Sequence, residues 1–355
     1  MVMMTRASIW YGVGFCLLIL IVAIIVAPRI SSKASVETNP APIHVRWLLS
    51  HQPVDLFARA TQVFAEELKK GSNGQMILEV VTPDSIGYKK GDVPNAEIFK
   101  QLDSGDVQIA SAYTVALGRQ DPEMWSLTLP YLFKSYDSMM PVLDGTVGRR
   151  ILDSYSAAST AHALAFTMSG GYRIIATRNT SIANLGDMKG LRIATSGGPV
   201  AEATLKAMGA IPVALDLENG SQMLDTQSID GVETTYSRLA EVLGSQTEYT
   251  KHINETNHSM FLTAILASDT FYDSLSPQNR KVLESAALAA AQVERQDSIV
   301  LSKQVKSRLE ARGSVVTTLS SQAQDAFKAA AQSVYAQVSP LIGVDIVKSV
   351  VDSQK

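Results

Sequence analysis

Strand-like and helical patterns alternate in the first third of the chain, and this order is the strongest constraint on the fold. Apolar residues recur at helical spacing between short strand-like runs that are rich in β-branched and apolar residues. The predicted strands cover 44–50, 75–83 and 106–113, and the predicted helices cover 54–70 and 95–105, with Asn95 as a candidate N-cap. A β-α-β-α-β order is the signature of a parallel sheet with helical crossovers.

The alternation begins again in the second half, so a chain of 355 residues has room for about two such units. The predicted strands are 162–169, 172–178, 190–195, 210–215 and 229–235, and the predicted helices are 199–209 and 220–228. From about Ser276 onward the chain is predicted to be helical, because a Ser-Pro start is followed by 277–311 without an internal glycine or second proline. Ligands of such two-domain α/β proteins usually bind in the cleft between the domains.

One strand-loop-helix segment, "KGLRIATSGG" at 189–198, has the pattern of a ligand site. A short strand runs into the loop Thr195-Ser196-Gly197-Gly198, and a helix is expected to start near Pro199. Backbone N–H groups at a helix N-terminus attract anions, and a loop of small and hydroxyl residues lets a ligand approach them.

The N-terminus contains no charged residue between Arg6 and Arg29 and is almost wholly apolar. Residues 1–34 are therefore interpreted either as a signal peptide, cleaved near Ala34, or as an uncleaved membrane anchor, because the run approaches the ~20 residues that span a bilayer. Either interpretation exports the rest of the chain. Residues 35–42 then form a polar linker.

Composition excludes several function classes. The net charge of −3 gives no basic surface for nucleic acid, and the lone Cys16 allows neither an intrachain disulfide nor a cysteine-rich metal site. The sequence has no P-loop, dinucleotide fingerprint or nucleophile elbow, and its five histidines are scattered; His252 and His258 are best explained as surface or loop residues. We therefore expect a binding protein that is not an enzyme and uses neither a metal nor a cofactor.

Eight segments in order resemble the solute-binding subunit of tripartite ATP-independent periplasmic (TRAP) transporters, of the dicarboxylate- and sialic-acid-binding (DctP) type. They are "FAEELKKGSNGQMILEVVTPDSIG", "AEIFKQLDSGDVQIASA", "LTLPYLFKSYDSM", "GGYRIIATRNTSIANLGDMKGLRI", "MGAIPVALDLENG", "DGVETT", "TNH" at 256–258 and "LSPQNRKVLESAA". Each segment alone is a weak signal, but the ordered set is fairly specific and covers nearly the whole exported part.

The resemblance implies an α/β fold of the two-domain periplasmic-binding-protein (type II) flytrap kind, with hinge strands and a helical C-terminal portion. Domain I would comprise 43–170 plus about 262–300, and domain II would comprise 171–261 plus about 301–355. Such a protein closes its cleft on a small ligand in the periplasm and hands the ligand to a membrane permease.

The resemblance also implies where the ligand binds, although this chain departs from the family pattern. The family arginine that ends a Gly-Leu-Lys-Leu-Arg-like strand corresponds to Ala194, a common asparagine corresponds to Thr234, and an acidic residue of the sialic-acid binders corresponds to Tyr113. Arg173 aligns with a second family arginine that reaches the ligand in many members; the alternative is a salt bridge at the hinge. Arg192 either substitutes for the missing arginine at 194 or is a solvated residue at the strand entrance.

The candidate ligand-binding residues combine Arg173 with hydroxyl and aromatic side chains, which suit a small organic acid or a related polyhydroxylated or aromatic solute. The full set is Trp47, Ser50, His51, Tyr113, Tyr172, Arg173, Arg192, Thr195, Ser196, Gly197, Thr234 and Tyr236. We expect a solute that is bulkier near position 194, or less dependent on a carboxylate there. Two functions stay open: a receptor that delivers the solute to a permease, and a membrane-tethered domain that senses the solute and signals to a partner protein.

Overall fold

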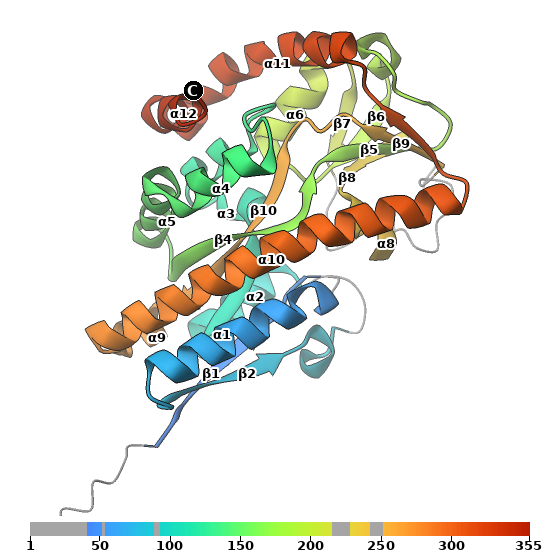
Figure 1. Ribbon diagram of the computed structural model, residues 1–355. Helices are drawn as coiled ribbons and strands as arrows, with labels where there is room; N and C mark the ends of the chain where they lie inside the picture. The colour runs from blue at the N-terminus through green and yellow to red at the C-terminus, as the bar shows by residue number, and fades with distance from the viewer. Residues whose placement is uncertain (1–40, 52–53, 89–92, 215–227, 242–250) are drawn as a thin grey trace, which may run out of the picture. The chain divides into compact units, whose positions relative to one another are not determined.

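The computed structural model describes residues 41–355, except 52–53, 89–92, 215–227 and 242–250 (Figure 1). The predicted signal peptide or anchor and nearly all of the predicted linker lie outside the described residues, as does nearly all of the helix predicted at 220–228. Among the residues that are described, none of the helices has the length and apolar character needed to cross a bilayer.

The first sheet has five strands in the order β2-β1-β3-β10-β4. They are β1 (Ile43–Leu48), β2 (Met76–Val81), β3 (Ile109–Tyr113), β4 (Ala161–Tyr172) and β10 (Met260–Ser268). The three strands β1, β2 and β3 are parallel, as the β-α-β-α-β pattern predicts, with α1 (Ala58–Gly71) and α2 (Asn95–Ser104) as crossovers. The prediction of Asn95 as N-cap is wrong: Asn95 is the first helical residue, and Pro94 holds the cap position without a side-chain hydrogen bond.

The second sheet has six strands in the order β11-β9-β5-β8-β6-β7. They are β5 (Ile174–Thr177), β6 (Arg192–Thr195), β7 (Ile211–Ala214), β8 (Gly231–Thr234), β9 (His252–Glu255) and β11 (Val315–Thr318). Strands β6, β7 and β8 are parallel neighbours, and β5 is antiparallel to both β8 and β9.

Three strands have no counterpart among the predicted elements, and each enters its sheet through long-range pairing. β10 is antiparallel to β3 and β4, so the first sheet is mixed. β11 pairs with β9 at the sheet edge, so the prediction that the chain is helical throughout after Ser276 is wrong. A four-residue strand that is exposed on part of its surface carries little periodic signal, because its partner strand supplies most of its stabilisation.

The other helices lie around the two sheets. They are α3 (Thr114–Leu117), α4 (Tyr136–Asp144), α5 (Thr146–Ala158), α6 (Gly198–Ala207), α8 (Tyr236–Glu241), α9 (Asp269–Ser274), α10 (Pro277–Ala311), α11 (Ser321–Ile342) and α12 (Val344–Asp352). Short 3-10 turns occur at Val54–Phe57, Pro83–Ile86, Pro122–Thr128 and Leu185–Met188.

The 35-residue helix α10 contacts both halves of the fold (Figure 1). It begins at the Ser276 cap, whose hydroxyl accepts from the backbone N–H of Asn279, with Pro277 at the first helical position. Its first half buries a row of small alanines against α1 and β4, and its second half buries Val305 and Leu309 in the core of the second sheet. Small side chains let the helix axis approach the sheet closely.

The C-terminal helices also contact both cores. The first half of α11 packs Phe327 into a cluster of the second sheet. Its second half and α12 pack against the first-sheet core, with Val338 and Ile346 among the residues that they bury. The division into domains I and II at the predicted boundaries stays a prediction.

Candidate functional site

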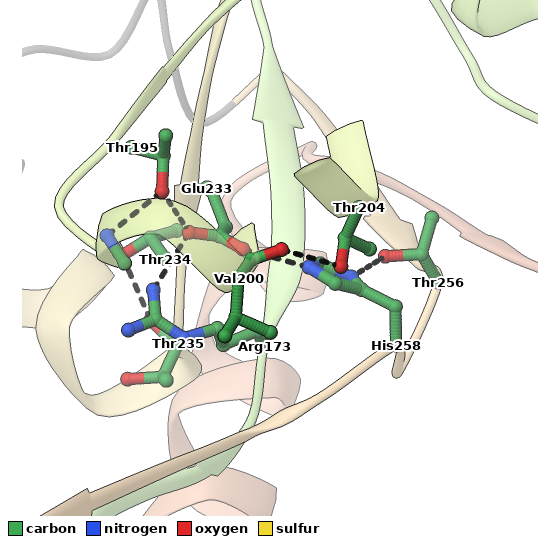
Figure 2. Close-up of polar contacts among 10 residues, drawn as sticks. Arg173, Thr195, Val200, Thr204, Glu233, Thr234, Thr235, Thr256 and His258 are labelled. Carbon is green, nitrogen blue, oxygen red and sulfur yellow. Dashed lines mark hydrogen bonds and ion pairs between the residues drawn. The ribbon is translucent and has the colours of Figure 1, made fainter. Parts of the chain in front are cut away.

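The site is built around Glu233, which lies on β8 and has a fully buried side chain (Figure 2). Its Oε2 lies 2.8 Å from Arg173 Nη1 and also accepts a hydrogen bond from the Thr195 hydroxyl, while its Oε1 lies 2.8 Å from His258 Nε2. Burial raises the pKa of Glu233, but Arg173 and His258 outweigh that effect and lower the pKa to about 2. The carboxylate is therefore ionised and only accepts, so His258 Nε2 carries a proton.

These side chains come from four separate places in the chain. Arg173 is the single residue between β4 and β5, so it stands where the chain passes from the first sheet to the second. Its backbone N–H donates to Ser259 O at 2.8 Å. Glu233 faces it from the neighbouring strand β8, Thr195 ends β6, and His258 lies between β9 and β10 with its Nδ1 2.8 Å from the Thr256 hydroxyl.

Arg173 is buried, and only part of its guanidinium is engaged. Burial lowers the pKa of Arg173, and the charge of Glu233 opposes this shift. The Cζ atom lies 4.4 Å from the ring centroid of Phe261, a distance at which a cation-π contact is favourable. Nη2, in contrast, is buried and has no hydrogen-bond partner in the described part of the chain. Leaving a buried donor without a partner costs about 1–3 kcal/mol of folding free energy, so binding an acceptor at this atom is favourable.

An aromatic wall adjoins the arginine. The rings of Tyr113 and Phe261 stack with centroids 4.7 Å apart, and the ring of His51 lies 3.8 Å from that of Tyr113. Arg238, on the short helix α8, donates from Nη1 to the Tyr113 hydroxyl at 2.5 Å, and its side chain is buried. The structure thus brings the predicted residues His51 and Tyr113 close to Arg173 through Phe261.

The Gly197 position allows the loop after β6 to close on Glu233. The Gly197 N–H donates to Thr195 Oγ1 at 2.9 Å, and a Cβ added at Gly197 would lie 3.2 Å from Glu233 Oε2 and would clash with Ala201. Ser196, between them, is partly buried. Thr234 is buried at the end of β8, and its hydroxyl lies 3.5 Å from Thr235 O.

The substitution Gly197→Ala is therefore expected to destabilise the protein by about 1–3 kcal/mol, because the added methyl overpacks the contact with Ala201 and Glu233. The free energy of unfolding, measured by urea titration, checks this. Lys206→Ala, at an exposed position of α6, the helix that Gly197 precedes, is the control and should change the free energy of unfolding by less than ~0.5 kcal/mol. Equal effects of the two substitutions would contradict a packing role for Gly197.

The other candidates make their contacts with groups outside this cluster. Trp47 is fully buried in the first-sheet core, with its ring 4.9 Å from Phe64, and Ser50 donates to Leu48 O at 3.2 Å. The hydroxyls of Tyr172 and Tyr236 donate to Phe133 O at 3.3 Å and to Glu255 Oε1 at 2.9 Å, respectively. Arg192 Nε lies 3.5 Å from an Asp230 carboxylate oxygen at the surface. The side chain of Ala194 is fully buried in the second-sheet core.

Sequence reasoning missed four residues of the cluster: Glu233, Arg238, His258 and Phe261. His258 lies in the loop between β9 and β10, as one of the two interpretations has it, but the surface interpretation is wrong, because its side chain is fully buried against Glu233. The segments "DGVETT" and "TNH" contain both residues, but nothing local indicates that they pair. Arg238 carried a weak signal, as the only charged residue in the stretch 234–240. Within the described ranges, no three His, Cys, Asp or Glu side chains gather as a metal site would require.

The model of bacterial extracellular solute-binding protein family 7 (DctP) matches residues 50–340. The chain belongs to this family. The C4-dicarboxylate-binding periplasmic protein DctP of Rhodobacter capsulatus is 29% identical over 267 residues, which cover 74% of this chain and 76% of that protein. The match confirms the resemblance to TRAP solute-binding subunits and identifies this family member as a solute-binding protein.

Solved structures confirm the two-domain α/β flytrap fold. The sugar acid binding protein DctPAm of Advenella mimigardefordensis, in complex with galactonate, superposes with a TM-score of 0.77 at 22% identity, covering 88% of this chain and 98% of that one. A TRAP periplasmic solute-binding protein of Pseudomonas putida F1, with bound D-glucuronate, gives a TM-score of 0.75 at 24% identity, covering 87% and 96%.

Proposed function

We propose that this protein captures a small organic acid outside the cytoplasm, with the carboxylate of the solute bound by Arg173, and delivers it to the membrane permease of a TRAP transporter. The supporting observation is that the two ends of one guanidinium differ: Nη1 bonds Glu233, and Nη2 is buried and has no hydrogen-bond partner among the residues that the structure describes. A charge-assisted hydrogen bond from a fixed donor contributes about 1.5–3 kcal/mol. Glu233 fixes the donor, and the solute completes its hydrogen bonding.

The other proposed contacts with the solute are assigned by asking which polar atoms already have hydrogen-bond partners within the chain. The Thr195 hydroxyl donates to Glu233 and accepts from Gly197. Its main role is therefore to hold Glu233, which in turn orients Arg173. Ser196 and Thr234 supply the hydroxyls for the rest of the solute, and Tyr113 with His51 supplies an aromatic surface. Because these groups come from both sheets, a solute that touches all of them favours the closed arrangement, which the permease recognises.

The chemistry of the relatives' ligands suggests the probes. A C4-dicarboxylate, galactonate and D-glucuronate are all carboxylates, named for proteins of this family or fold. Isothermal titration should compare succinate, galactonate and D-glucuronate with the neutral sugars galactose and D-glucose. We expect at least one acid to bind, and both neutral sugars to bind at least ~100-fold more weakly than that acid. Equal affinity for an acid and a neutral sugar would rule out a carboxylate anchor.

We also propose that the protein releases its solute chemically unchanged, as a receptor does. Proton NMR of the best-binding acid after prolonged incubation should show no new species.

The mass of the exported protein separates the two predicted fates of the N-terminus. Cleavage near Ala34 indicates a freely diffusing receptor, whereas retention of residues 1–34 indicates a tethered sensor or receptor.

A further inference from the structure

One face of α10 is polar where it crosses β4, although both elements are buried there. Glu294, Ser298 and Ser302 are spaced four residues apart, so they lie on the same side of the helix. Glu294 Oε2 accepts from Met168 N–H at 2.7 Å, Ser298 Oγ accepts from Gly170 N–H at 2.8 Å, and Ser302 Oγ donates to Gly170 O at 3.1 Å. We call these three side chains the hinge face.

The backbone that the hinge face holds leads directly to Arg173. Gly170 and Gly171 have φ values of 117° and 77°, in the region that favours glycine, and a Cβ at Gly170 would clash with Thr235 and Ser237. Residues 168–171 are thus packed between α10 and the turn after β8, two residues before the arginine. Hydrogen bonds to a main chain this tightly packed fix its path into the site.

We propose that Glu294, Ser298 and Ser302 are positioning residues for solute binding, holding residues 168–170 in the path that presents Arg173 to the solute. The proposal rests on the proposed function for its consequence in solute binding, whereas the contacts that carry it lie within the chain itself. Helix α10 contacts both sheets, and residues on three of its successive turns bond β4 just before Arg173. The helix therefore couples the position of Arg173 to the arrangement of the two sheets.

Glu294 gives the hinge face a chemical signature. Burial raises its pKa to about 8, and the hydrogen bond from Met168 and the charge of Arg295 oppose this shift only in part. The carboxyl is therefore mostly neutral at pH 7. Its Oε1 is buried and has no hydrogen-bond partner among the described residues, so an ionised carboxylate would lack the solvation it needs.

Few other charges act on Glu294. Arg295 is held by Asp144 at 2.7 Å, and Asp297 is paired with Arg59 at 3.1 Å. Besides burial and the hydrogen bond from Met168, the charges of Arg295 and Asp297 are the ones among the described residues that act on the pKa of Glu294. The charged and titratable residues with described side chains on the elements packed most closely against this helix are Asp55, Arg59, Glu66, Glu67, Lys69, Lys70, His162, Tyr172, Tyr236 and Arg238.

Ionisation of Glu294 should favour any state in which water reaches residues 168–170. In the unfolded chain the carboxyl loses its proton near its ordinary pKa of 4.5, whereas in the folded protein it keeps the proton up to about pH 8. Stability therefore falls as the pH rises through this window. Glu294→Gln keeps a neutral acceptor for Met168 and removes this dependence.

The test uses the exported chain from residue 35 onward as wild type, Glu294→Gln, Ser298→Ala and, as a matched control, Ser307→Ala, whose hydroxyl is on an exposed face of the same helix. Hydrogen exchange is read on peptides that cover 166–175, without solute. We expect exchange at Gly170 to be at least ~10-fold faster in Ser298→Ala, with faster exchange extending to Arg173, and unchanged in Ser307→Ala. Unchanged exchange in Ser298→Ala would overturn the proposal.

The second arm measures unfolding midpoints from pH 4.5 to 9. We expect the midpoint of Glu294→Gln to match that of wild type near pH 4.5 and to exceed it increasingly up to pH 8. Parallel pH profiles would overturn the role of Glu294. If an acid of the panel binds, Ser298→Ala should raise its Kd at least ~5-fold, and unchanged affinity would overturn the positioning role. If no acid binds, the proposed function fails, and the first two arms still decide whether the hinge face fixes the path to Arg173.

Discussion

Replacing Arg173 with lysine is expected to weaken binding of the best organic acid by about 10- to 100-fold. Lysine keeps a positive charge opposite Glu233, but its ammonium is a single point donor and does not reproduce the fork that serves Glu233 and the solute together. Loss of one charge-assisted hydrogen bond of about 1.5–3 kcal/mol corresponds to this range. Isothermal titration at pH 7 measures the change.

Arg192→Ala is the matched control for Arg173→Lys, because it removes an arginine that lies at the surface beside Asp230. Its affinity for the acid should stay within ~2-fold of wild type. The circular dichroism spectrum of each variant must match wild type before titration. An unchanged affinity in Arg173→Lys would show that the carboxylate binds elsewhere. A loss that occurs only in Arg192→Ala would revive the alternative that Arg192 substitutes for the arginine missing at 194.

Glu233→Ala is expected to have the largest effect on stability, about 3–5 kcal/mol. The substitution leaves the Arg173 guanidinium buried without its counter-charge and removes the acceptor of Thr195 and His258. Globular proteins are stable by about 5–15 kcal/mol in total, so much of the variant is expected to unfold at modest urea concentrations. Asp153→Ala breaks the exposed pair with Arg149 and should cost less than ~1 kcal/mol. Similar costs for the two variants would contradict the central role of Glu233.

The same carboxylate predicts how stability responds to acid. Since the pKa of Glu233 is lowered to about 2, its stabilising contribution is complete above its ordinary pKa of 4.5 and is lost as the pH falls from there toward 2. Wild type should therefore lose its stability advantage over Glu233→Gln across this window. Unfolding midpoints measured from pH 7 to pH 2.5 check this. An advantage that stays constant down to pH 2.5 would mean that the buried pairs do not depend on the ionised form.

The sequence predicts the local elements well where periodicity is strong and poorly where pairing is remote. The first three strands and their crossover helices follow from local patterns, and so do the strand at 192–195 and the helix after it. β9 and β11 are each four residues long and stabilise each other across about sixty residues of chain, so neither has a sufficient signal of its own. Asn95 illustrates the ordinary uncertainty at a helix boundary, a shift of one residue.

The site shows the same division between local and remote information. Arg173 and Tyr113 could be named from the resemblance, and the structure brings both to one cluster. Trp47 and Tyr236 are aromatic residues like Tyr113, but they lie in hydrophobic cores. The reason is that the direction of a side chain depends on which face of its strand or helix is covered. Glu233 and His258 could not be paired from the sequence, since 24 residues separate them and neither stands in a catalytic or metal-binding motif.

The segment "KGLRIATSGG" separates what each level of description decides. The sequence by itself determined that a strand, a glycine-rich loop and a helix occur there, that position 194 has no charged side chain, and that the chain belongs among two-domain solute receptors. Only the tertiary structure decided that Thr195 and Gly197 close around Glu233 and that Arg192 lies at the surface. It also decided that Arg173 has a buried donor with no partner in the described part of the chain. The physical reason is that local propensity is encoded in neighbouring residues, whereas burial and charge pairing arise only when remote segments meet.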